Sequence, residues 1–312
     1  MPRPLRVFLC HASQANLIAV LVLVVFLGAC KTQTVALTVI PTATQLIIPT
    51  QTPSIGSTMI SDKDGMTLLY VPAGKFIMGE KSEEALAICQ NFRSDCQLNQ
   101  FIGEEPPHEV NLNAFWIDQT EVTKAMYTKC VDASICQPPL YTHSYYSRAE
   151  LDNNPVGFVD WAMANTYCQW AGRRLPTDAE WEKAASWDDR TKTKRIYPWG
   201  DNIDCSFANY YGKIGGCVEG TTPVGSYEIG KSPYGAYDMA GNAWEWVNDW
   251  FSTKYYRDSP LFNPLGPDTG QYRVVRGGSS DHEGFNVRTT DRYWSVPSTF
   301  GYNLGFRCAS SP

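Results

Sequence analysis

The apolar residues near the N-terminus form one short, unbroken block. Residues 17–27 are 11 consecutive apolar residues, preceded by Arg3 and Arg6 and followed by Gly28, Ala29 and Cys30. A membrane-spanning helix needs about 20 such residues, so this block is too short to span a bilayer. A positive start, a short apolar core and small residues at its end are typical of a signal peptide.

A different pattern, with alternating and helical spacings, starts at Asp62. Residues 66–78 (M-T-L-L-Y-V-P-A-G-K-F-I-M) predict two short strands joined by a Pro-Ala-Gly turn. After Ser186 the chain is interrupted by Gly, Pro and Asn and shows little periodicity. The pattern therefore predicts an α+β domain that is rich in loops.

Three helix starts are marked by capping residues. Thr120 is expected to cap a helix that runs through Val131, and Asp160 one over residues 161–171 that ends at Gly172. Thr177 and Glu180 form a capping box, in which each side chain accepts from a backbone N–H that the first helical turn leaves unpaired.

The junction Leu27-Gly28-Ala29-Cys30 resembles a bacterial lipobox. The resemblance implies that residues 1–29 are removed and that Cys30 is acylated; an ordinary signal peptide with a coincidental cysteine is the alternative. Each buried CH₂ of an acyl chain contributes about 0.8 kcal/mol, so several chains on one residue anchor a protein firmly. We therefore expect a membrane-anchored lipoprotein on the extracytoplasmic face, at the cell surface or in the periplasm.

The stretch between this cysteine and the domain has the composition of a linker. Residues 31–61 contain no acidic residue, are rich in Thr, and include Pro41, Pro49 and Pro53. Such a segment cannot bury a core. Residues 30–61 are accordingly predicted to be an extended tether, and residues 62–312 the folded domain.

Composition indicates how large a folded core the chain can form, and charge indicates which partners are excluded. Of the 312 residues, 43% are hydrophobic and 13% aromatic, which suffices for one large domain or two small ones. The net charge is −6, and no basic block is present, which argues against a nucleic-acid partner.

Eight cysteines follow residue 62, and an even number in an exported domain indicates disulfides. No C-x-x-C pair occurs, which disfavours a zinc ribbon or a thioredoxin-like site. Eight cysteines allow about a hundred pairings, so the sequence alone leaves the connectivity open. Short loops favour three local pairs, Cys89–Cys96, Cys130–Cys136 and Cys205–Cys217, which leave Cys168 and Cys308.

A series of motifs in the domain resembles the formylglycine-generating-enzyme (sulfatase-modifying factor) family, over about residues 62–312. The motifs are V-P-A-G-K-F-I-M-G (71–79), E-E-P-P-H-E-V (104–110), T-E-V-T (120–123), N-P-V (154–156), Y-C-Q-W-A-G-R-R-L-P-T-D-A-E-W-E (167–182), Y-P-W-G (197–200), P-V-G-S (223–226), G-A-Y-D-M-A-G-N-A-W-E-W (235–246), R-G-G-S (276–279) and G-F-R-C (305–308). Their order and spacing carry the resemblance. It implies a C-type-lectin-like α+β fold with little regular secondary structure, and a disulfide between Cys168 and Cys308.

The resemblance also implies structural calcium, an ion that prefers six to eight oxygen ligands. The ligands would be the side chains of Asp238 and Glu245 and the carbonyls of Gly241 and Ala243. A glycine turn that presents Trp244 and Trp246 to the core is the alternative. A second site would use Asn209, Gly216 and the carbonyls of Tyr210 and Val218. That site is doubtful because Gly216 stands where the family has an aspartate, with Glu219 as a conceivable substitute.

The catalytic region departs from the family pattern. Active members hold copper(I) between two cysteines just after the R-G-G-S segment, and soft thiolates suit that soft ion. His282 and Val287 stand at those two positions here, whereas the pocket residue Ser279 is retained. We therefore expect neither copper nor formylglycine-generating oxidase activity.

The sequence does not favour a replacement metal site at Asp281-His282-Glu283. In an extended segment Asp281 and Glu283 point one way and His282 the other. A second histidine, His108 or His143, would be needed for an iron triad, and nothing in the sequence brings either close. A solvated polar loop is the simpler interpretation.

Three functions stay open. The first is a non-catalytic lipoprotein that binds a peptide, a glycan or an envelope partner through the family groove. The second is an oxidoreductase of the formylglycine-generating and non-haem-iron superfamily that works without cysteines, and the third is a structural accessory of an envelope complex. Trp244, Tyr293 and Trp294 suit stacking on a peptide or sugar, or packing in the core.

Overall fold

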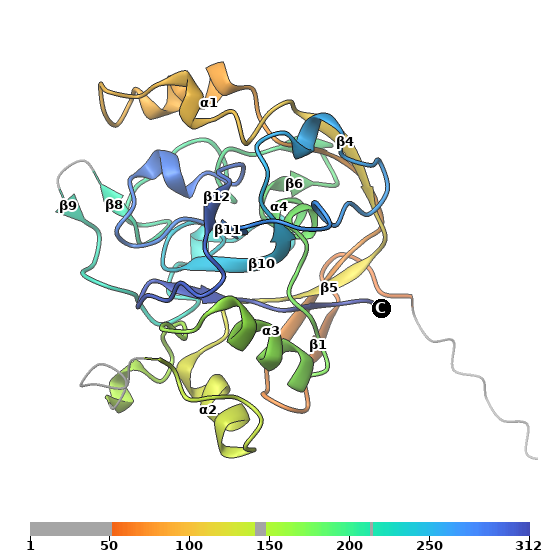
Figure 1. Ribbon diagram of the computed structural model, residues 1–312, viewed down its shortest axis with the longest axis vertical. Helices are drawn as coiled ribbons and strands as arrows, with labels where there is room; N and C mark the ends of the chain where they lie inside the picture. The colour runs from red at the N-terminus through yellow and green to blue at the C-terminus, as the bar shows by residue number, and fades with distance from the viewer. Residues whose placement is uncertain (1–51, 141–147, 213–214) are drawn as a thin grey trace, which may run out of the picture. The chain divides into compact units, whose positions relative to one another are not determined.

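The computed structural model describes residues 52–140, 148–212 and 215–312 (Figure 1). Cys30 and the predicted signal peptide, most of the tether, and His143 lie outside the described residues. Within the described part no helix is long and apolar enough to cross a membrane. The α+β fold predicted from the sequence is confirmed, since short helices and several small sheets are joined by long loops.

Two four-stranded sheets form the centre of the domain. The first has the strand order β1-β2-β5-β14 and the second the order β12-β11-β10-β13, in which β10 and β13 run parallel. The strands of these sheets are β1 (Thr58–Ile60), β2 (Thr67–Val71), β5 (Phe115–Asp118), β10 (Trp244–Trp250), β11 (Arg273–Arg276), β12 (Tyr293–Ser295), β13 (Leu304–Phe306) and β14 (Ala309–Ser310).

Three two-stranded ribbons complete the strand inventory of the described residues. They pair β3 (Gly74–Met78) with β4 (His108–Leu112), β6 (Trp187–Asp188) with β7 (Thr193–Lys194), and β8 (Tyr211–Gly212) with β9 (Gly215–Gly216). The predicted pair of strands over residues 66–78 is confirmed as β2 and β3.

The folded part starts earlier than the predicted boundary at Asp62. β1 pairs antiparallel with β2, with Thr58 opposite Leu69 and Ile60 opposite Thr67. The linker-like composition hid this strand because all three of its residues are exposed at the sheet edge. The prediction therefore placed the end of the tether a few residues too late.

Four α-helices are present in the described residues: α1 (Ser82–Cys89), α2 (Lys124–Asp132), α3 (Trp161–Trp170) and α4 (Asp178–Ser186). The caps of two were predicted correctly. Asp160 accepts from the backbone N–H of Met163, and Thr177 and Glu180 form the reciprocal capping box.

The cap predicted for α2 was wrong. Thr123, not Thr120, accepts the N–H of Met126, and the Thr120 hydroxyl donates to the Glu121 carbonyl instead. Both threonines of T-E-V-T satisfy the capping preference, and the tertiary fold selects the later one.

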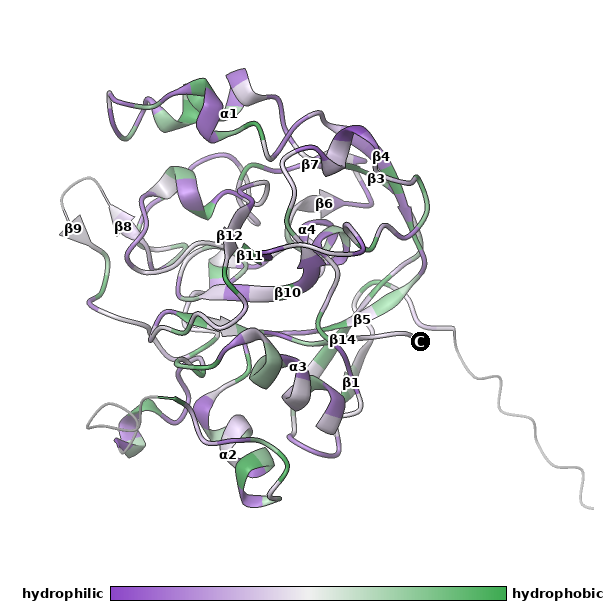
Figure 2. Ribbon diagram, in the orientation of Figure 1, coloured by the Kyte–Doolittle hydropathy of each residue, from purple (hydrophilic) through white to green (hydrophobic). Residues whose placement is uncertain are grey.

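The middle of the fold is polar as well as apolar. Every residue of α4 is buried, although Figure 2 shows that this helix carries hydrophilic residues. Two of its carboxylates pair with Arg276 of β11, which lies 2.5 Å from Asp178 and 2.8 Å from Glu182, and the third, Glu180, pairs with Arg174. Buried charges of this kind are tolerated because they are paired and hydrogen-bonded. α4 thus fixes the start of the loop that follows β11.

The eight domain cysteines form four disulfides, Cys89–Cys96, Cys130–Cys136, Cys168–Cys308 and Cys205–Cys217. This is the pairing set that loop lengths favoured, with the long-range bridge that the resemblance implied. Cys168–Cys308 spans 140 residues and joins α3 to the segment between β13 and β14.

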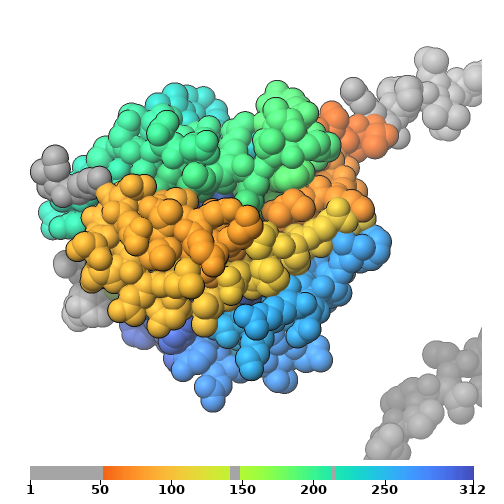
Figure 3. Space-filling view, turned by 90° about the horizontal axis from the view of Figure 1, so that it is seen from above, coloured from red at the N-terminus to blue at the C-terminus, as the bar shows by residue number. Residues whose placement is uncertain are grey.

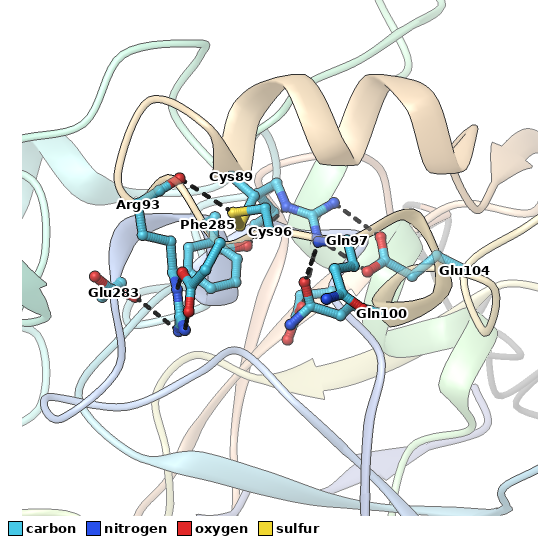
Figure 4. Close-up of a disulfide and its surroundings, with 11 residues drawn as sticks. Cys89, Arg93, Cys96, Gln97, Gln100, Glu104, Glu283 and Phe285 are labelled. Atoms are coloured by element: carbon cyan, nitrogen blue, oxygen red, sulfur yellow. Dashed lines mark hydrogen bonds and ion pairs between the residues drawn. A yellow bond between two sulfur atoms is a disulfide. The ribbon is translucent and has the colours of Figure 1, made fainter.

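The Cys89–Cys96 disulfide supports the loop after β11. Figure 4 shows it beside Phe285, which packs in one cluster with Cys89 and Phe101. Arg93, inside the same small loop, lies 3.5 Å from Glu283 (Figure 4).

Seen from above, the segment around α1 also lies against the segment around β7 (Figure 3), and Lys194 donates to the carbonyl of Gly79.

Candidate functional site

A cavity of about 210 Å³ opens beside the second sheet. Its walls come from the first residues of β10 and β13, from β11 and β12, and from the two loops that follow β11 and β12. The lining residues are Trp244, Val275, His282, Tyr293, Ser295, Thr299, Phe300, Gly301, Asn303 and Leu304. Tyr293 and Ser295 are two residues apart on β12 and therefore face the cavity together.

The loop that carries His282 is held by a tight glycine turn. Gly278 has φ of +70°, and a Cβ atom there would lie 2.5 Å from Cγ1 of Val287, so only glycine fits. The Gly241 N–H donates to the Gly277 carbonyl and ties the turn to the loop before β10.

Ser279 and His282 are brought together by this loop. The Ser279 Oγ and His282 Nδ1 atoms are 2.7 Å apart, and Trp244 Nε1 lies 3.2 Å from the same Nδ1. Asn303 Nδ2 lies 3.0 Å from Ser279 Oγ. Ser279 is fully buried, whereas His282 is half-buried at the cavity wall. Burial lowers the pKa of the His282 imidazole, and nearby Asp281 raises it by less.

The neighbours of His282 point elsewhere. Asp281 accepts from Tyr302 and Asn303, and Glu283 faces Arg93. His108 packs on Tyr256 with ring centroids 4.7 Å apart and is not part of this cavity. No three His, Cys, Asp or Glu side chains of the described residues are grouped as a metal site.

Val287, at the other cysteine position, belongs to the core. It is fully buried in a cluster with Tyr197, Ala208, Tyr210 and Ala240. Because all eight cysteines of the domain are bridged, no thiolate is available beside His282.

Comparisons with known proteins agree with the motifs and the fold. The model of the "Sulfatase-modifying factor enzyme 1-like domain" family matches residues 58–312. The chain belongs to the sulfatase-modifying factor family.

The relatives carry different activities. The formylglycine-generating enzyme of Streptomyces coelicolor is 32% identical over 293 residues, which cover 77% of this chain and 88% of that one. The hercynine oxygenase of Mycolicibacterium smegmatis is 30% identical over 74% of this chain and 58% of its own length. The solved structure of PvdO from Pseudomonas aeruginosa, 23% identical, superposes with a TM-score of 0.64 over 83% of this chain and 99% of that one, which shows a shared fold.

The carboxylate expected to bind the family's calcium has another partner here. Both oxygens of Glu245 face Arg307, with Oε1–Nη2 at 2.6 Å and Oε2–Nε at 2.7 Å, and Oε2 also accepts from Trp181. Glu245 and Arg307 are both fully buried. Protein donors thus take three of the roughly four acceptor sites of the Glu245 carboxylate, and calcium at Glu245 stays a prediction.

Asp238 instead lies beside Glu121, a residue that the sequence analysis did not single out. Burial and the neighbouring Asp238 raise the pKa of Glu121 well above its usual range, and Glu121 Oε1 is buried with no hydrogen-bond partner. Asp238 accepts the N–H of Gly225 at 2.7 Å. Two adjacent buried carboxylates need a shared proton or a cation, and hard oxygen donors suit calcium. Calcium at Asp238, with Glu121 as a further oxygen donor, stays a prediction, and a proton shared by the two carboxyls is the alternative.

The residues expected for the second calcium are occupied by hydrogen bonds of the β8–β9 region. Asn209 accepts the N–H of Val218 and donates to the Gly220 carbonyl. The Tyr210 carbonyl accepts from Cys217, and Gly216 pairs with Tyr211 in the ribbon. The structure brings these residues together through the backbone, with both ends of the Asn209 amide already used.

Proposed function

We propose that this chain is a lipid-anchored, non-oxidative member of the family that binds an uncharged sugar ring in the cavity beside His282. The observation that carries the proposal is the lining itself: it includes aromatic rings, hydroxyls and an amide, but no Lys, Arg, Asp or Glu. A charged ligand would lose its hydration there without gaining a partner of opposite charge.

A sugar fits this lining better than a peptide segment does. Its ring offers an apolar face for Tyr293, and its hydroxyls both donate and accept, as Ser295, Thr299 and Asn303 do. Tyr293 and Phe300 are 52% and 45% exposed, so both rings are accessible to a ligand from solvent. The ring of Tyr293 is also braced by Trp244, with centroids 5.6 Å apart.

The alternative is an oxidoreductase that works without cysteines, which the relative named hercynine oxygenase supports. It would require a metal held by residues other than the family's pair. The His282 ring nitrogen that faces the protein is already engaged by Ser279 and Trp244, which favours the binding function.

The test is binding of the full-length protein in detergent to arrays of neutral glycans, acidic glycans and peptides. We expect binding to neutral glycans, lost in Tyr293→Ala. Phe262→Ala is the matched control, because Phe262 is 63% exposed and does not line the cavity. Binding restricted to peptides or acidic glycans, or no binding at all, would contradict the proposal.

A further inference from the structure

The hydrogen bonds around His282 determine where its proton lies. The indole Nε1–H of Trp244 can only donate, and it lies 3.2 Å from His282 Nδ1. Nδ1 must therefore present its lone pair, and the proton of the neutral imidazole must be on Nε2. Trp244 is buried at the start of β10, where its backbone N–H donates to the Asn303 carbonyl, so the indole is held in place.

Ser279 agrees with this assignment. Its Oγ lies 2.7 Å from the same Nδ1, so its hydroxyl hydrogen is donated to the ring. The Oγ lone pairs stay available for Asn303 Nδ2, 3.0 Å away. Asn303 then donates to Ser279, and the hydrogens of Ser279 and Trp244 share the single Nδ1 lone pair of His282.

The opposite side of the ring is free for a ligand. His282 Nε2 has no hydrogen-bond partner among the described residues, it is not enclosed by protein, and the ring lines the cavity. We infer that Trp244 and Ser279 lock His282 as a neutral Nε2–H donor, so that this wall of the cavity recognises an acceptor oxygen on an uncharged ligand. The nature of the ligand rests on the proposed function; the lock itself does not.

The lock has two chemical consequences. A metal would need the lone pair of Nε2, which requires moving the proton to Nδ1, where it would face the Trp244 N–H. A general base would need to hold a proton at Nδ1, where it would again face the Trp244 N–H. Trp244 therefore disfavours both metal coordination through Nε2 and protonation of the ring at Nδ1. Trp244 is a positioning residue, which acts on the ligand through His282.

The lock is tested by ¹⁵N NMR of the histidine side chains in the full-length protein. We expect the tautomer signature of His282 to show an unprotonated Nδ1 and a protonated Nε2. Trp244→Phe keeps an aromatic ring but removes the donor, and should give a mixture of tautomers; Trp294→Phe, the same change at a residue outside the cavity, should not. A protonated Nδ1 in the wild type, or an unchanged signature in Trp244→Phe, would overturn the inference.

A metal probe gives a second readout. Nickel(II) alone should leave the His282 signals of the wild type sharp, and should broaden them in Trp244→Phe at a concentration at least tenfold lower. Equal broadening in both proteins would overturn the lock.

The ligand is tested separately. Methyl glucoside should shift the Nε2–H signal and glucuronate should not, and His282→Gln should retain more affinity than His282→Asn, because only the longer amide reaches the position of Nε2. If neither sugar shifts the signal while the tautomer result holds, the sugar proposal fails and the lock stands.

Discussion

Arg307 donates to both carboxylate oxygens of Glu245, from Nη2 to Oε1 at 2.6 Å and from Nε to Oε2 at 2.7 Å, and neither side chain is exposed to solvent. Removing one partner of such a pair leaves an uncompensated buried charge and typically costs about 3–5 kcal/mol. Loss of stability in a Glu245 variant would therefore occur with or without calcium, and the calcium prediction has to be tested at Glu121 and Asp238.

We expect calcium bound at Asp238 and Glu121 to raise the thermal midpoint. Binding to the folded state alone contributes about 2.7 kcal/mol at a hundredfold excess over Kd. Chelator should lower the midpoint of the wild type, and Asp238→Asn and Glu121→Gln should remove that response. Glu219→Gln, in the exposed region of the doubtful second site, should keep it.

A midpoint indifferent to both chelator and calcium would show that the Glu121–Asp238 pair shares a proton instead. Glu121→Gln would then retain wild-type stability, because the amide N–H₂ supplies the donor that the protonated carboxyl provided.

The four disulfides should contribute unequally. In the chain-entropy account, a bridge that closes 140 residues stabilises by about 5 kcal/mol, and one that closes 6 by about 2 kcal/mol. Replacing Cys168 and Cys308 by alanine should lower the denaturation midpoint more than replacing Cys130 and Cys136. Equal losses for the two double variants, measured by urea unfolding under oxidising conditions, would contradict this ranking.

Local signals predicted local structure well, while contacts between distant segments were out of reach. Asp160 and the Thr177–Glu180 box cap their helices as expected, since a cap involves residues three positions apart. The bond between Trp244 and His282 joins residues 38 positions apart, one at the start of β10 and one on the loop after β11, and only the folded sheet aligns them.

Glu121 was missed for the same reason. It lies within the motif T-E-V-T, and its importance arises only because the fold buries it against Asp238. The one signal in the sequence was a charged residue directly before the apolar Val122, which the structure shows to be buried. Ser279, His282 and Val287 were found because the resemblance marks their positions; what the side chains do there follows from their neighbours.

A buried carboxyl at the end of β10 should make the stability of the fold depend on pH. Burial, with a further contribution from Asp178, raises the pKa of Asp249 to about 8, and its Oδ2 accepts the N–H of Asp178. The folded state therefore keeps a proton that the unfolded chain releases near the ordinary pKa of an aspartate, about 4. This contribution is complete below that value and is lost as the pH rises through about 8.

Asp249→Asn should consequently flatten the fall in stability between pH 6 and pH 9, since the amide oxygen still accepts from Asp178 without ionising. Urea midpoints at both pH values measure the effect, with Asp268→Asn at an exposed site as the control. A slope in Asp249→Asn as steep as in the wild type would refute the assignment.

Lipid anchoring stays a prediction, because Cys30 lies outside the described residues. Cells fed a clickable fatty acid should label the wild-type protein and not Cys30→Ser, and the variant should leave the membrane fraction. Cys10→Ser, upstream of the apolar block, should label normally. Equal labelling of wild type and Cys30→Ser would exclude acylation at this position and leave an ordinary signal peptide.

The absence of oxidase activity is the sharpest prediction about the site. As the family resemblance implies, formylglycine formation needs two thiolates to hold copper(I) beside the substrate cysteine. His282 is a harder donor with its inner nitrogen engaged, Val287 is packed in the core, and all eight domain cysteines are bridged. The full-length protein, given copper, O₂ and a cysteine-containing C-x-P-x-R peptide, should leave the peptide unchanged by mass spectrometry.

The double variant His282→Cys with Val287→Cys tests whether the protein lacks only the two copper ligands or whether the surrounding backbone also fails to place them. If the frame is intact, the two new thiolates should bind one copper(I) ion per chain, measured against a competing chelator, whereas His282→Cys alone supplies one thiolate and should lose that competition. The double variant could instead bind copper and still leave the peptide unoxidised. That result would mean that the cavity, with its uncharged lining, does not bind the substrate peptide. Copper-dependent aldehyde formation by the wild type would contradict the non-oxidative function and require a copper site made without cysteine.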